Sequence, residues 1–260
     1  GHAYFFPGKF SDRAGAYYQK FGKEKTRKAM AQWYVNAIEN ARLCPTAQEF
    51  HNTTKDLFAQ GMLEPNPKGF VDNLNVFDCS KVSDGASAIA VVSEEGLRRC
   101  GIALKDAVEV IGFGQSEYDI TKAPTDPTVL ETTADAVKKA LNMAGITKEQ
   151  LATVECHDCF TIAGIMAVEA LGLAEHGKGP DYVLEGNTSR KGKVPFNTTG
   201  GLVGWGHPTG ATGVHQAVTI LEQLTGKAGD AQIDIPNDKP YGLSINMGGD
   251  DKTLVSIVYK

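Results

Sequence analysis

Residues 196–213, FNTTGGLVGWGHPTGATG, form a glycine-dense stretch that carries one histidine, His207. Six of these eighteen residues are glycine, which is favoured where the backbone takes a positive φ or approaches another group closely. Apolar residues then recur at helical spacing: Val214, Ala217, Val218, Leu221 and Leu224. The loop is therefore predicted to run into the N-terminus of an amphipathic helix, with backbone N–H groups near the imidazole. The alternative is a turn-rich loop with an incidental histidine, which is the commoner meaning of a lone Gly-His-Pro.

A second cluster lies upstream, in residues 151–160, LATVECHDCF. It predicts a short strand that ends in His-Asp-Cys-Phe and leads directly into an apolar helix over residues 161–171. A cysteine at such a junction can have its pKa lowered by the helix N-terminus, and His157 lies two residues from Cys159. The alternative is that Cys159 is a small buried apolar residue, as most free cysteines are.

Composition excludes several classes of function. Apolar residues make up 42% of the 260 residues and charged residues 22%, which is ordinary for a globular protein. The formal net charge of −5 gives no general basic field that would recruit nucleic acid. No apolar run reaches the roughly eighteen residues that a membrane-spanning helix needs.

The five cysteines are an odd number without the spacing of a disulfide framework, so we expect reduced thiols and a cytoplasmic, intracellular location. Cys156 and Cys159 form a C-x-x-C pair, which leaves a redox dithiol as an alternative. A zinc site would need a second such pair, and the chain has none, so no metal site is expected.

The first third of the chain predicts one strong helix over residues 26–42, with an apolar stripe that ends before Pro45. Residues 44–82 are predicted to be irregular, and the apolar run 88–92 is predicted to be a buried strand. A basic cluster at the start of the helix is interpreted as a solvated face: Lys23, Lys25, Arg27 and Lys28.

The remainder alternates strands and helices. Residues 108–114 predict a strand and residues 131–144 a helix, and the order from 108 to 260 is β, α, β, α, loop, α, β, β. Such alternation is typical of an α/β layered domain.

GGLVGWGHPTGATG together with an upstream HDCF resembles the C-terminal half of the thiolases, in the branch of sterol carrier protein 2 thiolase. Residues 81–97, KVSDGASAIAVVSEEGL, resemble the segment joining the thiolase loop domain to the end of the N-terminal half. Residues 241–260 are similar to the last two strands of the family. The resemblance implies an α/β, thiolase-like layered fold: the α-β-α C-terminal half plus part of the loop domain.

The implied division places the loop-domain segment and connection in residues 1–87 and the C-terminal thiolase-like domain in residues 88–260. No residue matches the family's nucleophilic cysteine, which belongs to the N-terminal half; Cys44, Cys79 and Cys100 lie in unsuitable contexts. We therefore expect a fragment of a longer thiolase or one subunit of a split one.

The resemblance also implies residue roles. His207 would activate the nucleophile and donate to the thioester oxygen, and His157 would help to build the same oxyanion hole. Cys159 would be the acid/base of this branch, because Asn246 stands where commoner thiolases have that cysteine. The backbone N–H of Gly248 would form part of a second oxyanion hole.

Three residues are expected on the substrate side of the site: Asn246, Gly206 and Phe160. Asp158 and Phe160 are expected to orient and pack the loop, and His215 is interpreted as a packing or surface residue. The basic cluster could approach the phosphates of coenzyme A. No tightly bound cofactor is expected, since a coenzyme A thioester would be the substrate.

The implied function is thiolase-type acyl transfer on acetyl-CoA or 3-oxoacyl-CoA, by Claisen condensation or thiolytic cleavage, with this chain inactive alone. The alternative is a non-catalytic, thiolase-like subunit that binds a CoA ester or acts as a scaffold. A ketosynthase would share the fold, but HDCF argues against it. Expected partners are the complementary N-terminal half, further copies in a homo- or hetero-oligomer, and a small OB-fold protein.

Overall fold

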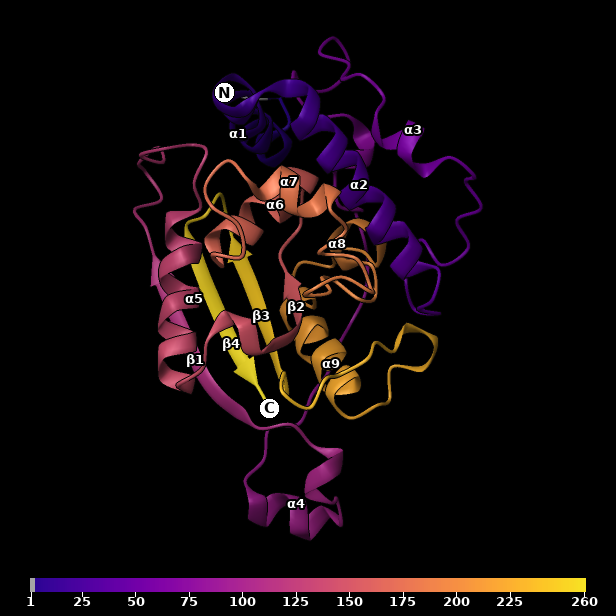
Figure 1. Ribbon diagram of the computed structural model, residues 1–260, viewed down its shortest axis with the longest axis vertical. Helices are drawn as coiled ribbons and strands as arrows, with labels where there is room; N and C mark the ends of the chain where they lie inside the picture. Colours follow the sequence, from indigo (N-terminus) through magenta and orange to yellow (C-terminus); the bar gives the residue numbers. More distant parts are fainter. Residues whose placement is uncertain (1–2) are drawn as a thin grey trace.

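A mixed four-stranded sheet forms the middle layer of the computed structural model, which describes residues 3–260 (Figure 1). Its strands are β1 (Val110–Glu117), β2 (Leu151–Cys156), β3 (Tyr241–Gly248) and β4 (Thr253–Tyr259), in the order β1-β4-β3-β2. β4 pairs antiparallel with both β1 and β3, whereas β2 pairs parallel with β3. The parallel pair directs the carboxyl ends of β2 and β3 toward one edge of the sheet.

Helices cover both faces of this sheet. α5 (Glu131–Ala144) and α6 (Thr161–Ala170) share one apolar core with the inward residues of β3 and β4, while α9 (Thr212–Leu224) packs on the opposite face. Glycines on the strands allow close approach: a Cβ on Gly114 would lie 2.0 Å from the Ala136 carbonyl oxygen, and one on Gly242 would lie 2.4 Å from Ile220. This confirms the predicted α-β-α layering.

Two long helices, α1 (Phe5–Phe21) and α2 (Lys23–Ala41), pack over α6 and extend its core. Phe10 of α1 stacks on Phe160 with ring centroids 4.7 Å apart, and Trp33 of α2 lies in the same apolar cluster. The predicted helix 26–42 is confirmed as α2, although it begins three residues earlier. α1 was not predicted.

The remaining elements are short. They are the helices α3 (Leu57–Gly61), α4 (Glu94–Cys100), α7 (Gly179–Leu184) and α8 (Gly201–Gly204), and the 3₁₀ turns η1 (Val76–Asp78), η2 (Leu104–Asp106), η3 (Lys148–Gln150) and η4 (Gly229–Ala231). The predicted irregularity of residues 44–82 is confirmed apart from α3 and η1.

The predicted strand over residues 88–92 is wrong. The segment has no assigned secondary structure and pairs with no strand among residues 3–260, and Val91 is 82% exposed. An apolar run becomes a strand only where another strand supplies ladder hydrogen bonds, and none lies beside this one. The segment instead leads to α4, which stands apart at one end of the structure (Figure 1).

The sequence-based domain boundary at residues 87 and 88 falls in this extended segment, and the division stays a prediction. None of the helices described between residues 3 and 260 has the length and apolarity needed to cross a membrane.

Candidate active site

The parallel pairing of β2 and β3 brings the predicted site residues to one edge of the sheet. Cys156, the last residue of β2, is paired with Ile245 of β3, so His157 and Asn246 follow at the same level of the two strands. An isolated parallel bridge joins Val154 to Phe196, which places the start of the glycine-rich loop on the free side of β2. Segments 151–160, 196–213 and 241–250 therefore converge where parallel strands end, a common place for ligand sites in α/β folds.

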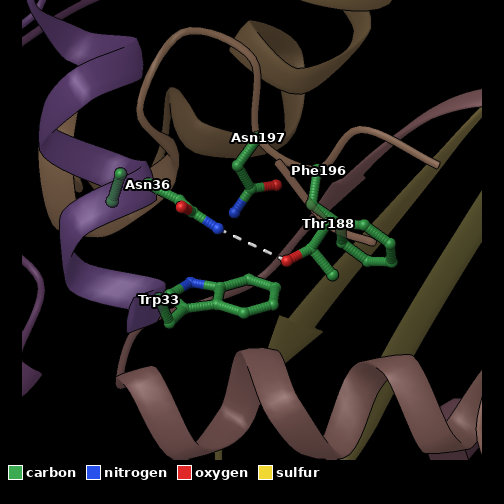
Figure 2. Close-up of a pocket in the computed structure, with 6 residues that line it drawn as sticks. Trp33, Asn36, Thr188, Phe196 and Asn197 are labelled. Carbon is green, nitrogen blue, oxygen red and sulfur yellow. Dashed lines mark hydrogen bonds between the residues drawn. The ribbon is translucent and has the colours of Figure 1, made fainter. Parts of the chain in front are cut away.

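Asn197 holds the glycine-rich loop against the end of β2. Its φ of 50° lies in the left-handed region, which asparagine tolerates better than most residues. Its Oδ1 accepts a hydrogen bond from the Cys156 backbone N–H at 2.7 Å, and its Nδ2 donates to the Cys156 carbonyl at 3.2 Å. Figure 2 shows the Asn197 side chain reaching toward Trp33 and Asn36 of α2, at the back of the loop. The Asn197 side chain thus makes the two hydrogen bonds to the Cys156 backbone that the backbone of a neighbouring strand would otherwise make.

His157 and His207 are in direct contact. Their ring centroids are 5.0 Å apart and the rings are nearly perpendicular, at 88°. Burial lowers the pKa of His157 to about 3, with a smaller contribution from His207, so its imidazole is neutral at pH 7. Its buried Nδ1 has no hydrogen-bond partner among residues 3–260, although buried polar atoms are normally satisfied. Its hydrogen-bonding capacity is therefore unsatisfied.

The position of His207 is fixed from two sides. Its backbone N–H donates to the Ser83 hydroxyl at 2.9 Å, and Val82 forms an isolated bridge with it. Its Nδ1 lies 2.7 Å from the Thr212 hydroxyl oxygen, and that hydroxyl donates to the Pro208 carbonyl. Nδ1 is then the protonated nitrogen, and Nε2 is left as an acceptor. Burial lowers the pKa of His207, which favours the neutral ring.

His215 packs behind this loop, as expected. Its ring stacks on Trp205 with centroids 3.5 Å apart, and its Nε2 lies 3.1 Å from the Thr199 hydroxyl oxygen. Burial lowers its pKa to about 4.

Cys159 differs from the expectation in its acidity. Its side chain is only 7% exposed and belongs to the main apolar core, so burial raises the pKa of its thiol well above the usual value. The charge of Asp158 adds to this rise, and the Phe160 backbone N–H opposes it only weakly. The helix N-terminus thus does not lower the pKa, because desolvation of the thiolate outweighs the dipole. At neutral pH the residue is a thiol.

The loop after β3 approaches Cys159 through Asp250, whose charge also raises the pKa of the thiol. Gly248 ends β3 and is exposed, two residues before Asp250. Asn246 does not point freely into solvent, because its Nδ2 donates to the Gln216 side chain of α9 at 3.2 Å. These contacts leave the predicted roles of Gly248 and Asn246 as proposals.

Phe160 is 4% exposed and stacked on Phe10, so its observed contacts are those of a packing residue. Gly206 has φ 127°, and a Cβ there would lie 2.7 Å from the Ser83 hydroxyl. Glycine is therefore required at this position so that the chain can reach His207.

An open cavity of about 360 Å³ borders this region, between residues 83–87 and residues 208–211. It joins the SDGAS segment to the loop that carries His207, and its wall is largely polar. A ligand entering here would approach the site from the side of Pro208.

The basic cluster of α2 is already paired with carboxylates. Arg27 is buried with Asp78 at 2.7 Å, contrary to its interpretation as part of a solvated face. The exposed lysines contact Glu64, Asp181 and Glu24: Lys23, Lys25 and Lys28, respectively. A phosphate would have to compete with these partners.

Four residues that support the site were not predicted: Trp33, Ser83, Asn197 and Thr212. Only Thr212 carried a local signal, because Thr four residues after Pro208 at a helix start can bond back to its carbonyl. The other three act through partners distant in sequence.

Comparison with known proteins agrees with this geometry. Residues 112–260 match the family of thiolase C-terminal domain-like proteins. An acetyl-CoA acetyltransferase from Methanothermobacter thermautotrophicus is 33% identical in an alignment 259 residues long, which covers 98% of this chain and 63% of that protein. Sterol carrier protein 2 from Homo sapiens is 32% identical in an alignment 195 residues long, which covers 73% of this chain and 35% of that protein. The chain thus spans less than two thirds of the length of these relatives.

Among solved structures, an Ltp2-ChsH2(DUF35) aldolase superposes with a TM-score of 0.79 at 17% identity, over 96% of this chain and 62% of that chain. At this identity the likeness shows the fold alone. With the family match, the curated relatives and the HDCF and GHPTGATG loops at one edge of the sheet, this chain belongs to the thiolase family, in the branch of the sterol carrier protein 2 thiolases.

Proposed function

We propose that this chain supplies the acid/base and oxyanion-hole residues of a thiolase-type acyltransferase acting on acetyl-CoA or 3-oxoacyl-CoA thioesters. The contact between His157 and His207 carries the proposal. Two neutral imidazoles that meet at the end of a parallel strand pair, one with an unpartnered buried nitrogen, are not required for packing. An imidazole N–H suits a thioester oxygen that gains negative charge during the reaction, and His207 would acquire one at Nε2 when it takes the proton of the nucleophilic thiol.

Thiolytic cleavage of a 3-oxoacyl thioester needs a thiolate to take the acyl group and an acid to protonate the departing α-carbon. Cys159 is proposed as that acid. Its raised pKa keeps the thiol protonated at rest, so it can pass a proton to the α-carbon as the carbon–carbon bond breaks. In condensation the same sulfur, as the thiolate, would take the proton back.

His207 is proposed to accept the proton of the nucleophilic thiol. Because Nδ1 bonds to the Thr212 hydroxyl, the basic lone pair lies on Nε2, and burial keeps the ring neutral. The backbone N–H of Gly248 is proposed to face the second thioester oxygen, with Asn246 and Gly206 near the substrate.

The nucleophile is proposed to come from the complementary N-terminal thiolase half, in a homo- or hetero-oligomer. A small OB-fold protein is a further proposed partner; the similar aldolase structure is named for two components, Ltp2 and ChsH2(DUF35). The unpaired apolar segment 88–92 is consistent with a second α/β unit, because such a run is typical of a strand covered on both faces.

The test separates the proposed acid/base from the nucleophile. Acetyl-CoA is incubated with the purified chain in D₂O, and deuterium entering the acetyl methyl group is measured by mass spectrometry. We expect uptake above the protein-free rate that rises with pH as the Cys159 thiolate forms, lost in Cys159→Ala and kept in Cys100→Ala, since Cys100 is exposed on α4. Thiolysis of acetoacetyl-CoA by this chain alone should be absent, because exchange needs no nucleophile whereas thiolysis does.

A second candidate is a non-catalytic subunit that binds a CoA ester or scaffolds a partner. The burial of Cys159 among apolar residues favours it, because a thiol at 7% exposure is shielded from solvent. Acetyl-CoA binding without deuterium exchange would support this candidate. The absence of both binding and exchange would contradict both functions.

A further inference from the structure

We propose that Asp158 is a positioning residue whose buried carboxylate locks the loop carrying His157 and Cys159 to the loop carrying His207. The roles of the three locked residues rest on the proposed function. The lock itself is argued from contacts, charge and backbone geometry.

The carboxylate of Asp158 is fully buried and joins three segments. One oxygen accepts the backbone N–H of Leu202 at 2.7 Å, and the other accepts the indole N–H of Trp33 at 2.9 Å. Leu202 belongs to α8, in the glycine-rich loop, and Trp33 belongs to α2. A buried carboxylate with charge-assisted hydrogen bonds of this length is a strong and directional tie.

The glycine-rich loop is shaped to receive this carboxylate. Gly201 has φ 60°, and a Cβ there would lie 2.6 Å from Asp158 Oδ1 and 2.7 Å from Oδ2. The same Cβ would lie 2.4 Å from the Asn197 amide nitrogen. The space beside Gly201 is thus filled by Asp158 and Asn197, which explains why this position of the glycine-rich loop is a glycine.

The hydrogen bond from Leu202 to Asp158 is connected to His207 by a short, hydrogen-bonded backbone segment. The backbone N–H groups of Trp205 and Gly206 both donate to the Gly201 carbonyl, so α8 continues into the residue that precedes His207. At the other end of the tie, Asp158 directly follows His157. The two imidazoles, 5.0 Å apart, are therefore held by one carboxylate placed between their loops.

Trp33 anchors the lock to the body of the fold. Its indole is 3% exposed, and its ring contacts Phe196 with centroids 5.7 Å apart. Figure 2 shows the indole lying under Asn197, with its nitrogen on the side of Asn36. A Cβ on Gly164 of α6 would lie 2.3 Å from the indole, so α6 closes the ring in from below. The donor therefore has little freedom to turn away from Asp158.

Asp158 also acts on Cys159 through its charge. Burial raises the pKa of Asp158 to about 7, while Trp33, Leu202 and Asn197 stabilise its ionised form. The ionised form raises the pKa of the neighbouring Cys159 thiol, second only to burial. Asp158 therefore affects the protonation of Cys159 as well as the position of the loops, and a purely structural contact would not change that protonation.

The experiment compares three variants of the full chain. Asp158→Asn keeps the size of the side chain but removes the charge, and its amide cannot accept from both donors. Trp33→Phe removes one donor and keeps the charge. Asp251→Asn is the matched control, because Asp251 is also a buried carboxylate with three hydrogen bonds, to Thr132 and Thr133 at the start of α5.

Two readouts are independent of catalysis. The pH dependence of Cys159 alkylation by iodoacetamide, followed by peptide mass spectrometry, should shift to lower pH in Asp158→Asn only. The ring C–H signals of His157 and His207 in NMR spectra should move in both Asp158→Asn and Trp33→Phe, because each loosens the loops. Both readouts should stay unchanged in Asp251→Asn.

An unshifted alkylation profile in Asp158→Asn, or an equal shift in Asp251→Asn, would overturn the proposal. If Asp158→Asn does not fold, unchanged histidine signals in Trp33→Phe overturn it and shifted signals support it. Acetyl-CoA deuterium exchange is measured in parallel, with a loss on the order of 10²-fold expected for a displaced group. If the alkylation and NMR results are as expected but the wild-type chain shows no deuterium exchange into acetyl-CoA, the positioning role of Asp158 stands and only the proposed function is rejected.

Discussion

The rings of His157 and His207 meet edge to face with centroids 5.0 Å apart, one from the end of β2 and the other from the loop before α9. Neither ring is charged at neutral pH, because burial lowers both pKa values. With its Nδ1 bonded to Thr212, neutral His207 presents an acceptor Nε2, which becomes an N–H donor to an oxyanion once it takes the proton of the nucleophilic thiol.

Replacing His207 with alanine should slow acyl transfer and condensation in the complete enzyme. The loss of one oxyanion donor typically costs on the order of 10²–10³ in rate, so we expect kcat for acetoacetyl-CoA thiolysis to fall by that factor. The control is His215→Gln, because His215 packs on Trp205 behind the loop. Comparable losses of kcat in both variants would show that loop packing, rather than the imidazole of His207, was lost.

Replacing His157 with asparagine should change how stability depends on pH. The folded pKa of about 3 is below the unfolded value of about 6.5, so below pH 6.5 the unfolded state binds a proton that the native state does not. The stability that neutral His157 gives the folded state is fully present above pH 6.5 and is lost as the pH falls toward 3. In urea unfolding between pH 6 and pH 4, the free energy of unfolding of the wild type should rise with pH through this group by about 1.4 kcal/mol per pH unit. The variant should lack this part of the slope. Parallel profiles would mean that His157 titrates normally in the folded protein.

Gly201→Ala should destabilise the fold more than Gly145→Ala. Both residues have a positive φ, 60° and 67°, so each substitution costs about 1–2 kcal/mol in backbone conformation. A Cβ at Gly145 meets nothing within 4 Å, whereas one at Gly201 overlaps Asp158 and Asn197 and adds about 1–3 kcal/mol of overpacking. The free energy of unfolding in urea measures the difference. Equal costs would mean that the loop moves freely away from Asp158.

The chain should associate with a second α/β unit through residues 88–92. Val91 is 82% exposed and Ile89 45%, in an apolar run without a strand partner, and exposed apolar segments mark interfaces. Size-exclusion chromatography with light scattering should show an oligomer of the wild-type chain or a complex with its partner half. Val91→Asp should weaken it, while Leu63→Asp, exposed elsewhere, should not. A stable wild-type monomer that also fails to bind a thiolase N-terminal half would contradict this prediction.

The order of elements from β1 to β4 could be predicted from the sequence, because each has its own periodicity. Helix 131–144 was predicted to the residue, since its apolar spacing is regular and Gly145 ends it. The two wrong or missed elements lack such a local signal, because their structure depends on distant parts of the chain. Residues 88–92 have the composition of a strand but no neighbouring strand, and α1 has no clean apolar stripe because it buries Arg13 and Tyr17.

Those two buried polar residues illustrate why α1 was missed. Arg13 pairs with Asp250 and Tyr17 donates to Glu169, both more than 150 residues away in sequence. Burial of such polar side chains is favourable only when a hydrogen-bonding partner is present, and no local sequence pattern predicts a partner so distant in the chain. The segment therefore looked like an aromatic, glycine-rich stretch without a face.

The family, the α/β layering and the two loops that carry His157, Cys159 and His207 follow from local features of the sequence: glycine density, strand-to-helix junctions and motif spacing. The protonation and mutual position of these side chains follow only from the folded chain. The thiol of Cys159 is held protonated by burial and by Asp158, where the local helix start suggested the reverse. The contact between the imidazoles depends on a carboxylate that bonds Trp33 and Leu202, residues 125 and 44 positions away. Desolvation and long-range hydrogen bonds exist only in the folded chain, so the acid/base state of the site follows from the fold.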